Sequence, residues 1–125
     1  MNWTATAAIM LALAVAIGAF GAHGLQGRLD AYSMGVYEKA VFYHFIHALG
    51  MLAIPLLVHA GLISSGAGKW TGWLLLAGIV LFSGSLYLLA ITGVRTLGAV
   101  TPFGGASFIA AWVTLAVCAF LSRDS

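Results

Sequence analysis

Charged side chains are scarce in this chain. Asp, Glu, Lys and Arg make up only 6% of its 125 residues, whereas 62% are hydrophobic, and a soluble domain has roughly 25% charged residues. This composition excludes an ordinary soluble domain and identifies an integral membrane protein. The five basic and three acidic residues are scattered, so no basic patch predicts nucleic-acid binding and no polybasic cluster predicts docking on anionic lipids.

Cysteine is nearly absent as well. The single Cys118 lies in an apolar run, which excludes an intramolecular disulfide and a Cys-based zinc site. An HExxH motif and a nucleophile elbow are also missing, the latter even around Ser85. We therefore expect a protein that is not an enzyme and that holds no metal or other cofactor. The alternative is a metal shared by His44 and His47, three residues apart, with His23 or Glu38 completing the shell.

What the sequence does have is four long apolar runs. They predict membrane spans at about residues 3–23, 40–63, 70–92 and 102–121, each long enough to cross a hydrocarbon core about 30 Å thick. The first run lacks the basic start of a signal peptide, so we interpret it as a retained helix. Thr101-Pro102 predicts the start of the fourth helix. We expect an all-α polytopic membrane protein, a four-transmembrane-helix bundle that forms a single domain over residues 1–125.

Residues 24–39 predict a short interfacial helix between helices one and two. Four side chains there form an apolar face and four others a polar face, which is typical of a helix that lies on a bilayer. The apolar set is Leu29, Tyr32, Val36 and Tyr37, and the polar set is Arg28, Asp30, Ser33 and Glu38. Gly35 is expected to make this helix short or kinked.

Four spans place both termini and the Lys69 turn on one side of the membrane, with residues 24–39 and 93–101 on the other. The basic residues do not choose between the two orientations, since Arg28, Lys39 and Arg95 oppose Lys69, Arg123 and the amino terminus. The base rate of cytoplasmic termini favours that orientation.

A candidate polar cluster falls on the side of residues 24–39: His23, Glu38, Tyr43, His47 and Arg95. Helical spacing puts His47 on a stripe with glycines of the second helix, and it aligns Arg95 with an inward stripe of the third if that helix extends so far. We interpret the cluster as hydrogen bonds that tie helix ends together. A titrating His47 in a proton path is the alternative, because ionisable groups inside membranes are functional candidates.

The stretch GAFGAHGL, residues 18–25, has a glycine at every third position. A phosphate-binding loop would need a preceding strand, so we interpret these glycines as close-packing positions on a helix. Small residues at helical spacing predict similar contacts elsewhere. The expected packing residues are Gly18, Gly21, Gly50, Gly84, Gly104, Ala111 and Cys118.

Four motifs carry a resemblance to a known family. GAFGAHGL, YEKAVFYHFIHAL at 37–49, GSLY at 84–87 and LGAVTPFGG at 97–105 resemble the YgdD-like family of small bacterial inner-membrane proteins. The resemblance implies a four-helix protein of the bacterial inner membrane and supplies no established activity. His44 stands where the family commonly has glutamine, which argues against a two-histidine metal site.

The expected function is that of a non-enzymatic integral membrane protein that contacts lipids or other membrane proteins and influences membrane organisation. Its expected partners are membrane lipids, further copies of itself or other membrane proteins, and not nucleic acid. The alternative is a small oligomeric carrier or channel component that uses the His/Arg cluster at one membrane face.

Overall fold

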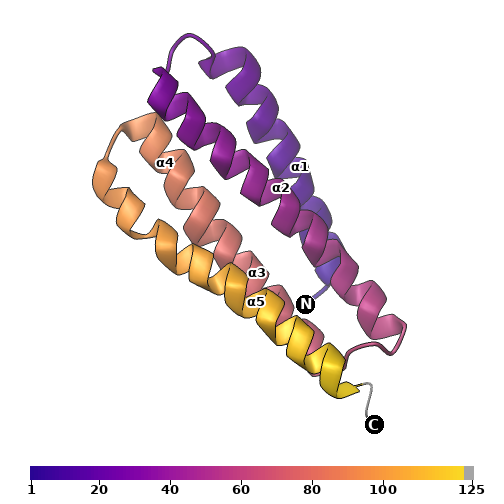
Figure 1. The fold of residues 1–125 in the computed structure, drawn as a ribbon. Helices are drawn as coiled ribbons and strands as arrows, with labels where there is room; N and C mark the ends of the chain where they lie inside the picture. Colours follow the sequence, from indigo (N-terminus) through magenta and orange to yellow (C-terminus); the bar gives the residue numbers. More distant parts are fainter. Residues whose placement is uncertain (123–125) are drawn as a thin grey trace.

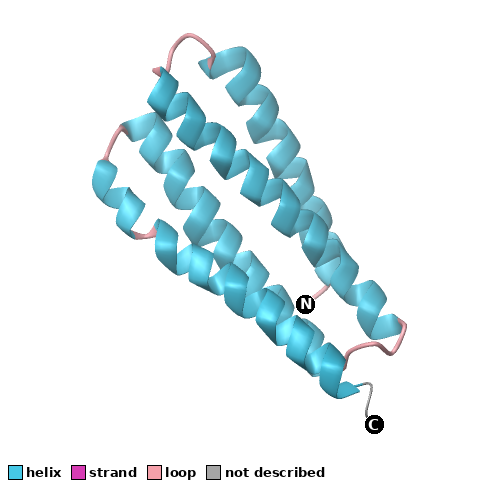
Figure 2. Ribbon diagram, in the orientation of Figure 1, coloured by secondary structure: helices cyan, strands magenta, loops and turns pink. Residues whose placement is uncertain are grey.

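The computed structural model describes residues 1–122. Within them every regular element is helical and no strand forms (Figure 2). Four stretches are long and apolar enough to cross a membrane, which confirms the expected all-α polytopic class. In chain order the elements are α1 (Trp3–Phe20), the π-helical turn η1 (Gly21–Leu25), α2 (Ala31–His59), α3 (Ser65–Gly78), the π-helical turn η2 (Ile79–Ser83), α4 (Gly84–Thr92), the 3-10 turn η3 (Arg95–Ala99) and α5 (Thr101–Ser122).

The helix ends follow local side-chain chemistry. Three polar residues outside the helices accept a hydrogen bond from a free backbone N–H of the first turn: Asn2 from Ala5, Asp30 from Ser33, and Ser64 from Ala67. Gly93, with φ 74°, ends α4 in the left-handed conformation that glycine adopts readily. Helix α5 begins at Thr101 with Pro102 in its first turn, as predicted.

The separate interfacial helix expected between residues 24 and 39 does not form. Residues 31–39 are instead the first turns of α2, which runs unbroken to His59. Tyr37 of that apolar set and the nearby Met34 are buried in the bundle, whereas Tyr32 is 51% exposed, so only part of the apolar face packs on neighbouring helices. Gly35 does not interrupt α2, because one glycine costs a helix only about 1 kcal/mol.

Helix α2 occupies the centre of the bundle. It packs against α1 on one side and against α3, η2 and α4 on the other, while α5 packs mainly on α3 and η2 (Figure 1). The buried apolar core comes from all four spans and comprises Ala7, Ala48, Met51, Ile54, Leu75, Ile79, Phe108 and Ala111.

The two ends of the bundle differ in what they carry. The start of α1 and the end of α5 lie at one end together with the connection at residues 60–64, and the connections at 26–30 and 93–100 lie at the other (Figure 1). We call these the terminal end and the loop end. Arg123, one of the residues in the charge comparison, lies outside the described residues.

Candidate functional site

Polar side chains from α2 and α4 meet inside the bundle. His44 Nδ1 lies 2.8 Å from the hydroxyl oxygen of Tyr87, and the ring of Tyr87 contacts that of Tyr37 with centroids 5.4 Å apart. The Tyr37 hydroxyl in turn donates to the Ile17 carbonyl of α1. These contacts link three spans through groups that would be costly to leave unbonded in a membrane.

His47 lies one turn further along α2, in an aromatic setting. Its ring stacks on Phe108 of α5 with centroids 3.5 Å apart. Its Nδ1 lies 2.7 Å from the Tyr43 carbonyl oxygen, and since a carbonyl only accepts, Nδ1 carries the proton of the neutral ring. The histidine thus joins α2 to α5 through ring stacking while its polar edge is held by its own helix.

Serine hydroxyls make the remaining links between spans. Ser83, in η2, donates to the Ala40 carbonyl of α2 at 2.8 Å, and Ser107 of α5 donates to the Leu74 carbonyl of α3 at 2.7 Å. Ser85 and Thr101 pair at 2.6 Å between their hydroxyl oxygens. Within lipid such bonds hold helices together because hydrophobic burial contributes little there.

Two buried polar atoms have no such bond. Within residues 1–122, His44 Nε2 and Thr71 Oγ1 make no hydrogen bond of normal geometry, although His44 faces the backbone of Met10. His44 is only 3% exposed and Thr71 is fully buried. A buried nitrogen without a well-formed hydrogen bond is unusual, and at His44 the Met10 backbone is an acceptor toward which the ring can donate.

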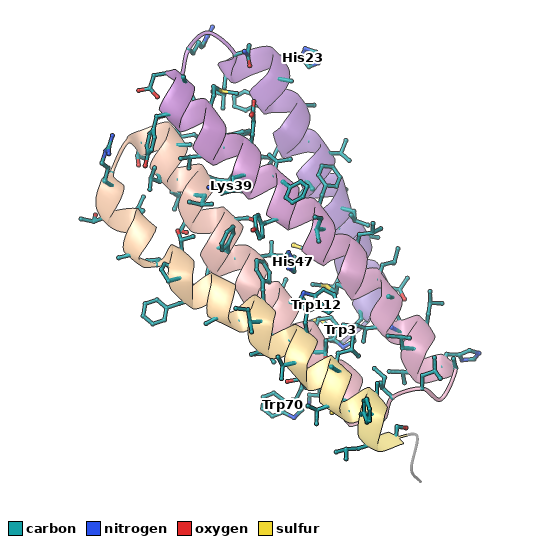
Figure 3. The ribbon with its side chains drawn as sticks, in the orientation of Figure 1. Trp3, His23, Lys39, His47, Trp70 and Trp112 are labelled. Carbon is teal, nitrogen blue, oxygen red and sulfur yellow. The ribbon has the colours of Figure 1, made fainter. Side chains whose placement is uncertain are left out.

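The structure divides the predicted polar cluster between two places. His23 lies exposed on η1 at the loop end, far from the terminal end where Trp3 and Trp70 lie, and His47 lies between these ends (Figure 3). Because α2 begins at Ala31 rather than at residue 40, His47 is about 24 Å along its axis. Tyr43 accompanies His47 in the interior, whereas Glu38 is exposed.

Arg95 does not point into the bundle, contrary to the expected inward stripe on the third helix. That helix ends at Thr92 and the chain turns at Gly93, so Arg95 is outside the helical register. Leu88 and Ile91, which share the predicted stripe, are each 54% exposed. The guanidinium carbon lies 4.7 Å from the ring centroid of Tyr32, which joins the 93–100 connection to the first turn of α2 by a cation–π contact.

Asp30 belongs to the same exposed surface at the loop end. The Ser33 backbone N–H donates to its carboxylate at 2.7 Å. This bond chiefly, with a smaller contribution from the charge of Arg95, holds the pKa of Asp30 below its usual value. Asp30 therefore remains charged at neutral pH, and the loop end presents ion-forming side chains to water rather than a buried ionic site.

The expected packing positions differ in how closely other helices approach. A Cβ at Gly18 would lie 3.3 Å from Val41, one at Gly21 would overlap the Tyr37 ring, and one at Gly50 would lie 2.5 Å from Trp112. A Cβ at Gly104 would overlap the backbone nitrogen of Phe82. Ala111 is fully buried and Cys118 is half-buried.

Gly84 is the exception among the packing residues. A Cβ there would meet nothing within 4 Å, because Gly84 faces a depression of about 460 Å³ between α4 and the 97–100 turn. Its small size therefore does not serve a close helix contact.

The positions of the histidines bear on the alternative of a metal shared by His44 and His47. Among residues 1–122, no three or more His, Cys, Asp or Glu side chains lie close enough to hold a metal ion. The Nδ1 atoms of His44 and His47 are both engaged, with Tyr87 and with the Tyr43 carbonyl. The described residues thus present no ready ligand set.

Sequence reasoning missed the contacts that connect distant segments. His44 and Tyr87 are 43 residues apart, as are Ala40 and Ser83, and no local spacing pairs them. Neither Tyr87 nor Ser83 is singled out by the spacing of its neighbours in the sequence. The motifs at 37–49 and 84–87 contain His44 and Tyr87. These motifs are the sequence signal that could have pointed to this pair.

Comparison with known proteins gives one consistent result. The profile of the family described as "Protein of unknown function (DUF423)" matches residues 17–105. The chain is 49% identical over 113 residues to the UPF0382 membrane protein SH2409 of Staphylococcus haemolyticus, covering 90% of each chain. It is 48% identical over 114 residues to the UPF0382 membrane protein YwdK of Bacillus subtilis, again covering 90% of each. No solved structure matches the chain.

Proposed function

Since the chain belongs to the DUF423 family of proteins of unknown function, whose relatives are named membrane proteins, we propose that it is a non-enzymatic protein of the bacterial inner membrane. We also propose that the YgdD-like family, which the motifs of this chain resemble, and the DUF423 family are one family. One transmembrane domain contacts lipids or other membrane proteins, as a single chain or a homo-oligomer, and so influences membrane organisation. Its termini face the cytoplasm.

This proposal rests on the positions of polar side chains inside the bundle and of apolar side chains on its outer surface. Inside the bundle, hydroxyl and imidazole groups bond mainly to neighbouring spans. Outside it, large apolar side chains are exposed along the helices, including Leu56 at 68%, Phe103 at 69% and Phe120 at 72%. Exposed apolar patches of this extent mark interaction surfaces, and for a helix long enough to span a bilayer the nearest partner is an acyl chain.

Lipid retention tests the proposal. The full chain is extracted in polymer-bounded particles of native membrane, and the lipids in these particles are identified by mass spectrometry and compared with the bulk membrane. We expect at least one lipid class to be enriched around the protein. A lipid composition identical to the bulk membrane would contradict a specific role in lipid organisation.

The alternative function is that of a small carrier or channel component. The observation that favours it is the buried, unbonded Nε2 of His44, since ionisable groups inside membranes commonly mark ion pathways. The proposed His/Arg cluster at one membrane face would need a partner chain to form, because Arg95 lies at the surface of the loop end and His47 in the interior. Proton flux distinguishes this function from lipid contact.

A further inference from the structure

A cavity of about 590 Å³ opens at the terminal end of the bundle. Its lining comes from the start of α1, the end of α2 and the start of α3, and includes Asn2, Trp3, Pro55, His59, Ser65 and Lys69. We call it the terminal-end pocket. Its volume lies within the range of about 300–1,000 Å³ that is usual for small-molecule sites.

Close helix contacts border the terminal-end pocket. A Cβ at Gly68 would lie 2.7 Å from Val58, so α3 and α2 meet closely under the cavity. A Cβ at Gly72 would lie 2.6 Å from the Trp3 ring, and that ring packs edge-on against Trp73 with centroids 5.5 Å apart. Helix contacts thus border the cavity, although Met1 and Asn2, which precede α1, also line it.

The chemistry of the lining is that of a receptor for an anion with an apolar part. Lys69 and His59 lie on two different helices at the rim, and Ile54, Pro55 and Val58 form an apolar wall. The acidic residues of the described chain, Asp30 and Glu38, lie near the start of α2, which places Glu38 about 30 Å along the helix from His59. Asp124 lies outside the described residues.

The pocket also lies at the depth of a lipid headgroup. Trp70 is 65% exposed and Trp73 is 44% exposed, and Trp70 lies with Trp3 at the terminal end of the bundle (Figure 3). Tryptophans concentrate where the bilayer meets water. A positively charged rim beside apolar walls at this level matches a lipid whose phosphate is anionic and whose chains continue into the bilayer.

We propose that the terminal-end pocket binds the phosphate-bearing headgroup of an anionic phospholipid. This inference rests on the proposed function and names one lipid class and one site for it. The Lys69 ammonium neutralises the phosphate, His59 lines the same pocket, and the apolar wall accommodates the start of an acyl chain.

Native mass spectrometry of the full chain in detergent tests the site, with phosphatidylglycerol, phosphatidylcholine and inorganic phosphate as separate probes. Two variants alter the pocket in different ways. Lys69→Gln removes its charge. Gly66→Leu fills it without changing charge, and Gly66 has room for a side chain, since a Cβ there would meet only Ser64 Oγ at 3.9 Å. Lys39→Gln removes an equal charge from an exposed position on α2 outside the pocket.

We expect the wild-type chain to retain phosphatidylglycerol in preference to phosphatidylcholine. Lys69→Gln and Gly66→Leu should each weaken that retention about tenfold, and Lys39→Gln should leave it unchanged. Equal losses in Lys69→Gln and Lys39→Gln would show general charge attraction and overturn the site. Binding of inorganic phosphate without lipid preference would overturn the lipid assignment.

The failure of this site is distinguishable from the failure of the proposed function. If the chain shows no preference for phosphatidylglycerol but native particles still enrich another lipid, the site is wrong and the proposed function stands. If native particles show no enrichment either, both are wrong.

Discussion

The two interior histidines of α2 differ in which groups hold them. His47 stacks on Phe108 and its Nδ1 is held by the Tyr43 carbonyl, so a ring face and a polar edge both contribute to packing. His44 pairs with Tyr87 through Nδ1 but leaves Nε2 unbonded. His47 is thus held by ring stacking on another span, and His44 by a hydrogen bond to another span.

Removing the His47 ring should destabilise the bundle. His47→Ala deletes the stack on Phe108 and leaves a cavity between α2 and α5, which we expect to cost about 2 kcal/mol and to lower the midpoint of thermal unfolding by several degrees. Circular dichroism in detergent measures that midpoint. The matched control is His59→Ala, since His59 is exposed at the end of the same helix. Equal midpoints for the two variants would contradict the structural role of His47.

The close approach of η2 to α5 brings the backbones of two helical segments together. A side chain at Gly104 would overlap the backbone of Phe82, which cannot move aside as a flexible side chain can, whereas one at the adjacent Gly105 would lie 3.9 Å from the Phe82 ring. Small residues let helices approach in this way in membranes. The π-helical turn η2 also carries Ser83, whose hydroxyl bonds to α2, so this turn contacts both neighbouring spans.

Gly104→Ala and Gly105→Ala therefore form a matched pair at the scale of the element. We expect Gly104→Ala to lower the thermal midpoint clearly, because α5 must move away from η2. Gly105→Ala should leave it unchanged or raise it slightly, since alanine favours a helix over glycine by about 1 kcal/mol. Thermal unfolding in detergent is again the measurement, and a larger loss for Gly105→Ala would refute the contact.

The elements show which features of this fold the sequence predicts and which it does not. Long apolar runs predict four spans because hydrocarbon thickness sets their length. Hydropathy marks only the part inside hydrocarbon, however, and so it missed the first turns of α2, where Glu38 and Lys39 lie. The predicted inward position of Arg95 was wrong because helical spacing does not reveal that the chain turns at Gly93, which has a left-handed conformation.

At the scale of the whole molecule, the bundle has two chemically different ends. The loop end carries Asp30 and Arg95, whereas the terminal end carries the pocket with His59 and Lys69. Each end would face a different compartment if all four helices span the membrane.

Reporter fusions test that arrangement. Reporters fused before residue 1 and after residue 125 should report the same compartment, and we expect the cytoplasm. A reporter inserted in the 93–100 connection should report the opposite compartment. Opposite results for the two ends of the chain would require an odd number of spans and would refute the four-span topology.

We propose that the interior polar groups hold the helices together while the outer surface contacts lipid, and that the bundle conducts no protons. Proton flux into proteoliposomes under an imposed membrane potential measures this most directly, with a pH-sensitive dye inside vesicles that contain the wild-type chain, His44→Gln or no protein. The account predicts the same rate of pH change in all three. A faster rate with the wild-type chain that His44→Gln abolishes would contradict it and identify His44 as part of a proton path.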